Sequence, residues 1–289
     1  MGILLNFYYC YITFVKLSIM LVIIISVRLI LENNFDYTRT PLDLPMPEMP
    51  QLVTTVIYGI GAVIFVAYAL YLSKKHKSVL PICLVLGACL TIFLEPIVDL
   101  LGNAVHPQIG QFNVVTTNGH HVPWAVLIGY IWYFAGTPLL CYSKFVNQTL
   151  TQSYVWKLFA VIVLGAATVE QIPLYFGVWI YYGYQPWIIG YMPIWWIFAN
   201  TAAVLVPFIL VYKLFPDLRG WKQAMVIWIL PMGAFMGHSA AGWPMYNVLG
   251  TETENFSRVM MYFSSGATVA LSLFVVWLFM KICGINDSP

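Results

Sequence analysis

Long apolar stretches alternate with short polar connections along the whole chain. A helix needs roughly 20 apolar residues to cross about 30 Å of hydrocarbon. Eight stretches meet this requirement, near residues 8–31, 52–73, 79–101, 123–143, 155–179, 187–212, 223–246 and 259–280. Because these runs are continuous and do not alternate with period two, they predict helices and exclude a membrane β-barrel. The expected fold class is all-α, a polytopic transmembrane bundle of eight helices.

The first stretch differs from the others because Lys16 interrupts it. No small-residue cleavage site follows it, so we interpret it as a signal anchor rather than a cleaved signal peptide. The bundle then consists of a seven-helix core and an N-terminal anchor. No linker or obvious repeat divides residues 1–289, which are expected to form a single transmembrane domain.

Basic residues fall in alternate connections, which predicts an orientation. They lie around the connections after the second, fourth and sixth stretches and in the tail: Lys74, Lys75, Lys77, Lys144, Lys157, Lys213, Arg219, Lys222 and Lys281. Cytoplasmic connections are enriched in Lys and Arg. Both termini are therefore expected in the cytoplasm, with the protein in the endoplasmic reticulum of a eukaryote or the plasma membrane of a bacterium.

Composition narrows the class of protein. The chain is 61% hydrophobic and 8% charged, against about 25% charged residues in a soluble domain, which excludes a soluble enzyme. A net charge of +2 without a basic tract argues against a nucleic-acid partner. The five cysteines form no CxxC motif, so neither a disulfide framework nor a cysteine metal site is expected. The oligomeric state is left open.

Three acids lie inside predicted spans: Glu95 and Asp99 in the third, and Glu170 in the fifth. An acid at the centre of a membrane helix costs about 2.5–3.5 kcal/mol, so each is a candidate catalytic residue. Glu95 and Asp99 are four residues apart and share one helix face, where two carboxylates cannot both ionise cheaply. One of them should hold a proton and act as a Brønsted acid. Alternatively, Asp99 is solvated at the interface. Pro96 and Pro173 predict irregular backbone beside these acids.

His238 lies within the seventh span and is a fourth candidate catalytic residue, with a purely structural role as the alternative. It needs a buried partner, for which one of the three acids is the expected candidate. The small residues around it are expected to allow close helix packing. His106, His120 and His121 follow the third span. Because they form neither HxxxH nor HxxE on one predicted helix, we interpret them as loop histidines. No metal and no other cofactor is expected.

Aromatic residues make up 17% of the chain, more than interfacial belts require. An aromatic wall stabilises a cation by up to about 2 kcal/mol per contact when water is excluded. The candidate substrate-binding residues are Tyr133, Trp195, Trp196, Asn200, Trp243 and Asn247. Asn200 alternatively forms a hydrogen bond between helices.

A protonated acid in a dry aromatic pocket suits one reaction class: protonation of an isoprenoid alkene or epoxide, followed by guided ring closure of the carbocation. The substrate would be a lipophilic isoprenoid entering from the membrane lipid. In its helix count, Glu95 and aromatic load the chain resembles the small integral-membrane terpene cyclases of meroterpenoid pathways. Those enzymes are seven- or eight-helix bundles that use embedded acids and no metal. The resemblance implies the reaction class, and we expect Glu95 to be the proton donor.

Other functions use similar residues. A proton-coupled transporter also needs intramembrane acids, a histidine and proline-broken helices, although no inverted repeat is visible and the acids cluster toward one side. A seven-helix light sensor is disfavoured because the last span has no lysine for retinal. Another acid–base enzyme acting on a lipid, such as an isomerase or hydratase, would use the same residues as a cyclase.

Overall fold

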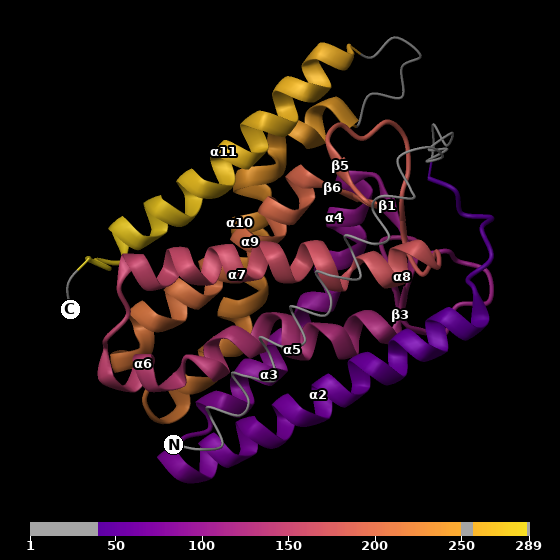
Figure 1. Cartoon of the computed structure of the whole chain (residues 1–289). Coiled ribbons are helices and arrows are strands. Elements are labelled where there is room, and N and C mark those ends of the chain that lie inside the picture. Colours follow the sequence, from indigo (N-terminus) through magenta and orange to yellow (C-terminus); the bar gives the residue numbers. More distant parts are fainter. Residues whose placement is uncertain (1–39, 250–256, 288–289) are drawn as a thin grey trace.

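The structure is a computed structural model that describes residues 40–249 and 257–287, so the predicted anchor at residues 8–31 lies outside it. It is mostly helical (Figure 1). The α-helices are α2 Glu48–His76, α3 Leu80–Leu90, α4 Glu95–Gly102, α5 Trp124–Leu140, α6 Tyr142–Asn147, α7 Gln152–Val169, α8 Gln171–Tyr175, α9 Ile194–Leu214, α10 Val226–Leu249 and α11 Arg258–Ile282. Short 3-10 helices are η1 Thr91–Leu94, η2 Phe215–Asp217 and η3 Gly220–Met225.

Six helical stretches of the described residues are long and apolar enough to cross a membrane. They are Glu48–His76, Leu80–Gly102, Gln152–Tyr175, Ile194–Asp217, Gly220–Leu249 and Arg258–Ile282. The predicted fourth span corresponds to α5, which is apolar but has only 17 residues. The chain is therefore a multi-pass integral membrane protein.

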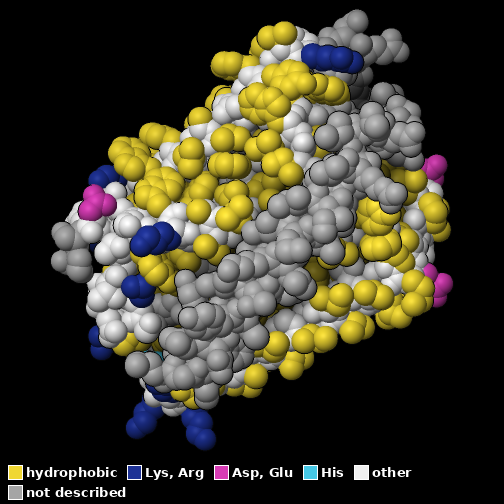
Figure 2. Space-filling model, viewed as in Figure 1, with side chains coloured by type: hydrophobic (Ala, Val, Ile, Leu, Met, Phe, Trp, Pro, Cys, Tyr) yellow, Lys and Arg dark blue, Asp and Glu magenta, His cyan; other side chains and the backbone are white. Residues whose placement is uncertain are grey.

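Helix α9 forms the centre of the bundle. In the apolar 18-residue segment of this helical stretch, 78% of the residues are buried. Such burial is expected for a helix that is hydrophobic on all sides. It packs against α10, α11, α7 and α5. Helix α2 is much less buried, because only 17% of the residues in its apolar 18-residue segment are inside the protein. Its exposed apolar side chains suit contact with lipid, and Figure 2 shows how extensively such side chains cover the visible surface.

Small residues allow α9 and α10 to pack closely, as the sequence predicted. A Cβ atom added to Gly237 would lie 2.3 Å from the carbonyl oxygen of Ala202. One added to Gly233 would lie 2.8 Å from Cα of Pro207. Because backbone cannot move aside as a side chain can, both positions require glycine.

The connections that carry most Lys and Arg meet at one end of the bundle, the basic end (Figure 2). The hydroxyl of Ser78, after α2, donates a hydrogen bond of 3.1 Å to the side-chain carbonyl oxygen of Gln223 in η3. The backbone N–H of Gln152 donates to the carbonyl of Asn286 near the end of α11. The prediction that this end faces the cytoplasm stays a prediction.

The opposite end, the strand end, contains short strands that the sequence did not predict (Figure 1). They form three antiparallel pairs: β1 Ala104–Val105 with β4 Ile180–Tyr181, β2 Asn113–Thr117 with β3 His120–Pro123, and β5 Ile188–Ile189 with β6 Met192–Pro193. The fifth and sixth predicted spans are correspondingly too long toward this end. Gly177, Gly183 and Gly190 there have positive φ, a conformation that interrupts a helix.

The contact between α9 and α10 can be tested with matched glycines. Gly237→Ala should overpack this contact and reduce stability by about 1–3 kcal/mol. Gly59→Ala in α2 is the control, because an added Cβ meets no atom within 4 Å. Thermal unfolding of the purified protein in detergent should show a lower midpoint for the first variant alone. Equal midpoints for the two variants would contradict the close packing.

Candidate functional site

Two of the spanning stretches are interrupted at an acid. The 3-10 helix η1 separates α3 from α4, and Glu95 begins α4 with Pro96 next to it. Glu170 lies at the joint between α7 and α8, three residues before Pro173. The predicted irregular backbone is confirmed at both acids. It arises because proline lacks the N–H needed to continue the helical ladder.

The acids line one cavity of about 400 Å³. It lies between α2 and α5 on one side and α7 and α9 on the other, and reaches α4 and the strand end. Its polar lining includes Glu95, Asp99, His106, Tyr130, Tyr133, Glu170 and Asn200. Its aromatic lining includes Tyr58, Phe65, Trp132, Phe134, Trp179, Tyr181 and Trp196. Acids and aromatic rings therefore line the same cavity.

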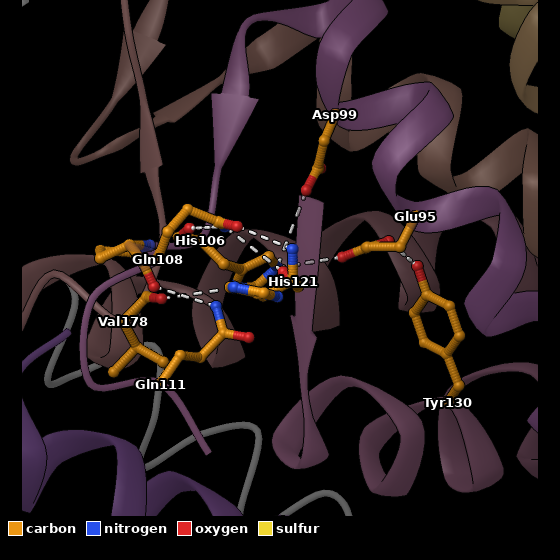
Figure 3. A network of polar contacts seen from close by, with 9 residues as sticks. Glu95, Asp99, His106, Gln108, Gln111, His121, Tyr130 and Val178 are labelled. Carbon is orange, nitrogen blue, oxygen red and sulfur yellow. Dashed lines mark hydrogen bonds and ion pairs between the residues drawn. The ribbon is translucent and has the colours of Figure 1, made fainter. Parts of the chain in front are cut away.

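Glu95 is the centre of a polar network (Figure 3). One carboxyl oxygen lies 3.2 Å from Nε2 of His106, and the other accepts a hydrogen bond from the hydroxyl of Tyr130. Asp99 contributes a carboxyl oxygen 3.8 Å from the same Nε2 atom. The Glu95 carboxyl group is thus held by Tyr130 of α5 on one side and by His106 of the strand end on the other.

His106 lies in the loop between β1 and β2, as the sequence predicted, but this loop histidine is buried. Its side chain is only 6% exposed, and it joins the two acids. Helix α4 ends at Gly102, and the positive φ of Asn103, the next residue, reverses the chain direction and brings His106 back along the helix. His120 and His121 lie on β3 rather than in a loop, and His121 is exposed.

The protonation pattern of His106 follows from its second contact. Its Nδ1 atom lies 3.3 Å from the carbonyl oxygen of Val178, which can only accept a hydrogen bond. Nδ1 therefore carries the hydrogen, and in a neutral ring Nε2 would present a lone pair to two carboxyl groups. Such an arrangement requires a proton or a metal ion among the three side chains.

The same three side chains could hold a metal ion. One ligand atom from each of Glu95, Asp99 and His106 lies within 4.8 Å of the other two. A histidine that binds metal typically donates its other N–H to a carbonyl or carboxylate, as His106 does to Val178. The expectation of no metal thus stays a prediction that needs a direct measurement.

The wall of the cavity has unpaired polar groups. The hydroxyl of Tyr133 and Nε1 of Trp132 are buried without a hydrogen-bond partner among the described residues. Both residues line the cavity. Buried polar groups normally have partners, so these two suit an oxygen atom of a ligand or a bound water.

Tyr181 closes the cavity at the strand end, outside the spanning helices. Burial raises the pKa of its phenol well above the ordinary value, and the nearby charges of Glu170 and Asp99 raise it further. The phenol therefore stays neutral. Its ring lies 5.3 Å from that of Trp196, edge to face.

Trp196, which lines the cavity, is held by several neighbouring groups. Its ring centroid lies 5.1 Å from that of Trp195 and 5.0 Å from that of His238. A Cβ atom added to Gly102 would lie 1.9 Å from Cζ3 of Trp196, so the indole fills the space beside this glycine. The position of Trp196 is thus set by α4, α9 and α10 together.

His238 does not have the predicted carboxylate partner. Its Nδ1 atom forms a hydrogen bond with the hydroxyl of Tyr246, and its Nε2 atom has no partner among the described residues. His238 lies behind Trp196 as seen from the cavity, which separates it from the acids. The prediction of a carboxylate partner is wrong because α10 packs on the outer side of α9.

The predicted site residues thus fall into three groups. Those that line the cavity are Glu95, Asp99, Glu170, Tyr133, Trp196 and Asn200. Trp195 and His238 are buried and pack against Trp196 from outside the lining. Trp243 is 55% exposed, and Asn247 donates a hydrogen bond to its carbonyl oxygen; neither residue lines the cavity.

The support behind Trp196 can be tested through Tyr246. Tyr246→Phe keeps the stacked ring but leaves both nitrogens of buried His238 without a partner, at a cost of about 1–3 kcal/mol. Tyr262→Phe is the control, because its hydroxyl pairs with Tyr184 on an exposed surface. Thermal unfolding should show a lower midpoint for Tyr246→Phe than for Tyr262→Phe. A Tyr246→Phe protein as stable as the control would show that the hydrogen bond is dispensable.

Comparisons with known proteins assign no family to this chain. No protein-family model, curated protein or solved structure matches it. Its function therefore has to be argued from the cavity and the residues that line it.

Proposed function

We propose that the chain is an integral-membrane isoprenoid cyclase of the terpene or meroterpenoid type that starts its reaction with a proton and uses no metal. The observation that carries this proposal is the convergence of three acids and a wall of aromatic rings on one cavity within an apolar bundle. A cavity of about 400 Å³ falls within the size range of sites for small organic molecules.

In the proposed reaction Glu95 is the proton donor. A substrate alkene takes the proton with its π electrons, forming a C–H bond and leaving a carbocation on the neighbouring carbon. With an epoxide, the oxygen takes the proton and the C–O bond breaks to the same effect. The hydrogen bond from Tyr130 and the contact with His106 fix the direction of the carboxyl group, as proton transfer requires.

The aromatic rings would guide the cation. Trp196, Trp179 and Tyr133 line the cavity. An aromatic ring whose face meets the cation can stabilise it by up to about 2 kcal/mol when water is excluded. Further alkenes of the substrate then attack the cation and close rings. Glu170, which lines the cavity from the joint of α7 and α8, takes the final proton from a neighbouring carbon. One proton enters and one leaves, so the product is an isomer of the substrate.

The proposal predicts that Glu95→Gln lowers the turnover rate by about 100-fold or more, because an amide group cannot donate the proton as the carboxylic acid does. Membranes containing the protein are fed farnesylated phenols, their terminal epoxides and linear polyprenols, and products are analysed by mass spectrometry. A product of unchanged mass and altered retention should form only with an intact Glu95. Glu48→Gln is the matched control, since Glu48 is exposed and lies outside the cavity.

Two results would contradict the proposal. Full activity of an expressed Glu95→Gln protein would remove the proposed donor. Absence of product from every substrate would favour the runner-up function, a proton-coupled transporter, which is tested by uptake of candidate lipophilic molecules into liposomes with a proton gradient.

The aromatic wall gives a second prediction. Trp196→Ala should change the ratio of products more than the amount of protein, because it enlarges the cavity and removes one stabilising face. Trp243→Ala is the control, because this tryptophan is exposed away from the cavity. Chromatographic product ratios at equal protein level provide the measurement. Identical ratios for the two variants would exclude Trp196 from contact with the substrate.

A further inference from the structure

A second, much smaller hollow lies next to the main cavity at the strand end. Its volume is about 10 Å³, roughly the space that one water molecule needs. Asp99, His106, Gln108, His120 and His121 contribute to its lining. Of these, His121 is exposed on the surface of the β2–β3 hairpin.

The small hollow and the main cavity share part of their walls. Asp99, Ala104 and His106 line both of them. Glu95 lines only the main cavity, and His120 and His121 line only the small hollow. The Asp99 and His106 side chains therefore separate a polar space near the surface from the aromatic cavity.

We propose that Asp99, His106 and the small hollow form a proton route from the aqueous surface of the strand end to Glu95. The inference rests on the proposed function, because a Glu95 that donates a proton in each turnover has to be reprotonated before the next. It adds His106, which that function does not require by itself, as the residue that returns the proton.

The contacts define each step of the transfer. Asp99 takes a proton that water in the small hollow carries as hydronium, leaving a neutral water molecule, and passes it to Nε2 of His106, 3.8 Å away, which converts the ring to imidazolium. The same Nε2–H then donates its proton to Glu95, 3.2 Å away, and the ring becomes neutral again. One proton has moved from water to Glu95, and Asp99 and His106 have returned to their starting states.

The hydrogen bond from Nδ1 to the carbonyl of Val178 persists through both steps. The ring therefore needs neither a flip nor a change of tautomer, because one nitrogen atom both accepts and donates the moving proton. Imidazole is the side chain best suited to this task near neutral pH.

Further hydrogen bonds hold the walls of the small hollow in place (Figure 3). The side-chain amide of Gln108 donates to the carbonyl of His106 at 2.5 Å and accepts from the backbone N–H of His121 at 2.7 Å. The His121 ring in turn contacts the hydroxyl of Thr116 at 2.7 Å. These bonds tie the His106 loop to the hairpin. Among the described residues, no Lys or Arg lines either space to oppose a positive charge on His106.

The route can be tested without any substrate. The full chain is placed in lipid nanodiscs, the buffer is changed from H₂O to D₂O, and the infrared C=O band of the protonated Glu95 carboxyl group is followed over time. Glu95→Gln identifies the band by its loss. His106→Gln preserves hydrogen-bonding groups but cannot carry a proton, so exchange should become about tenfold slower or more.

His76→Gln is the matched control, because His76 ends α2 at the basic end, away from both spaces. It should exchange at the rate of the unaltered protein. Asp99→Asn is a second variant that should also slow exchange, so the test does not depend on one substitution. Thermal unfolding identifies any variant that has lost its fold.

The outcomes separate this inference from the proposed function. Slow exchange in His106→Gln and Asp99→Asn supports the route, even if no substrate is cyclised and the cyclase proposal falls. Unchanged exchange in both folded variants overturns the route, even if the protein is a cyclase. A stoichiometric metal ion in the purified protein that is lost in His106→Gln also overturns it, because the ion would occupy Nε2.

Discussion

A carboxyl group inside a membrane bundle has to find polar partners within the protein, and this constraint organises one half of the structure. Glu95 lies in a span that is otherwise apolar, where an unpartnered acid is costly. Its partners come from two different directions, Tyr130 on α5 and His106 beyond the end of α4. His106 in turn depends on Val178, from the connection that follows α8. One acid thus links three segments that are distant in sequence.

The other half of the structure is held by close packing of apolar surfaces. Helix α9 is buried on all sides, and α10 approaches it where glycines leave the backbone accessible. The two halves meet at Trp196, which belongs to the central helix and forms part of the cavity wall. The arrangement of the acids and the shape of the aromatic wall therefore depend on the same helix contacts.

The sequence predicted those features that depend on local rules. Apolar length identified the described spans, prolines located the breaks at Glu95 and Glu170, and small residues in the seventh span indicated close packing. It did not predict contacts that depend on how distant segments meet. The strands around residues 104–123 and 180–193 are too short to leave a periodic signal. The burial of His106 and its contact with Glu95 depend on the chain reversal at Asn103. For His238 the sequence offered three buried acids as partners, and nothing in it indicated that Tyr246 is the partner instead.

The contact between Gly102 and Trp196 has a consequence for how this protein can change during evolution. The indole occupies the volume that any side chain at position 102 would need, with a separation of 1.9 Å from an added Cβ atom. A larger residue at 102 fits only after position 196 has become smaller, whereas the reverse order passes through a protein in which the two side chains overlap. Neighbouring substitutions of this kind are not additive. Homologues with a differently shaped cavity should therefore carry paired replacements at these two positions, with the change at 196 acquired first.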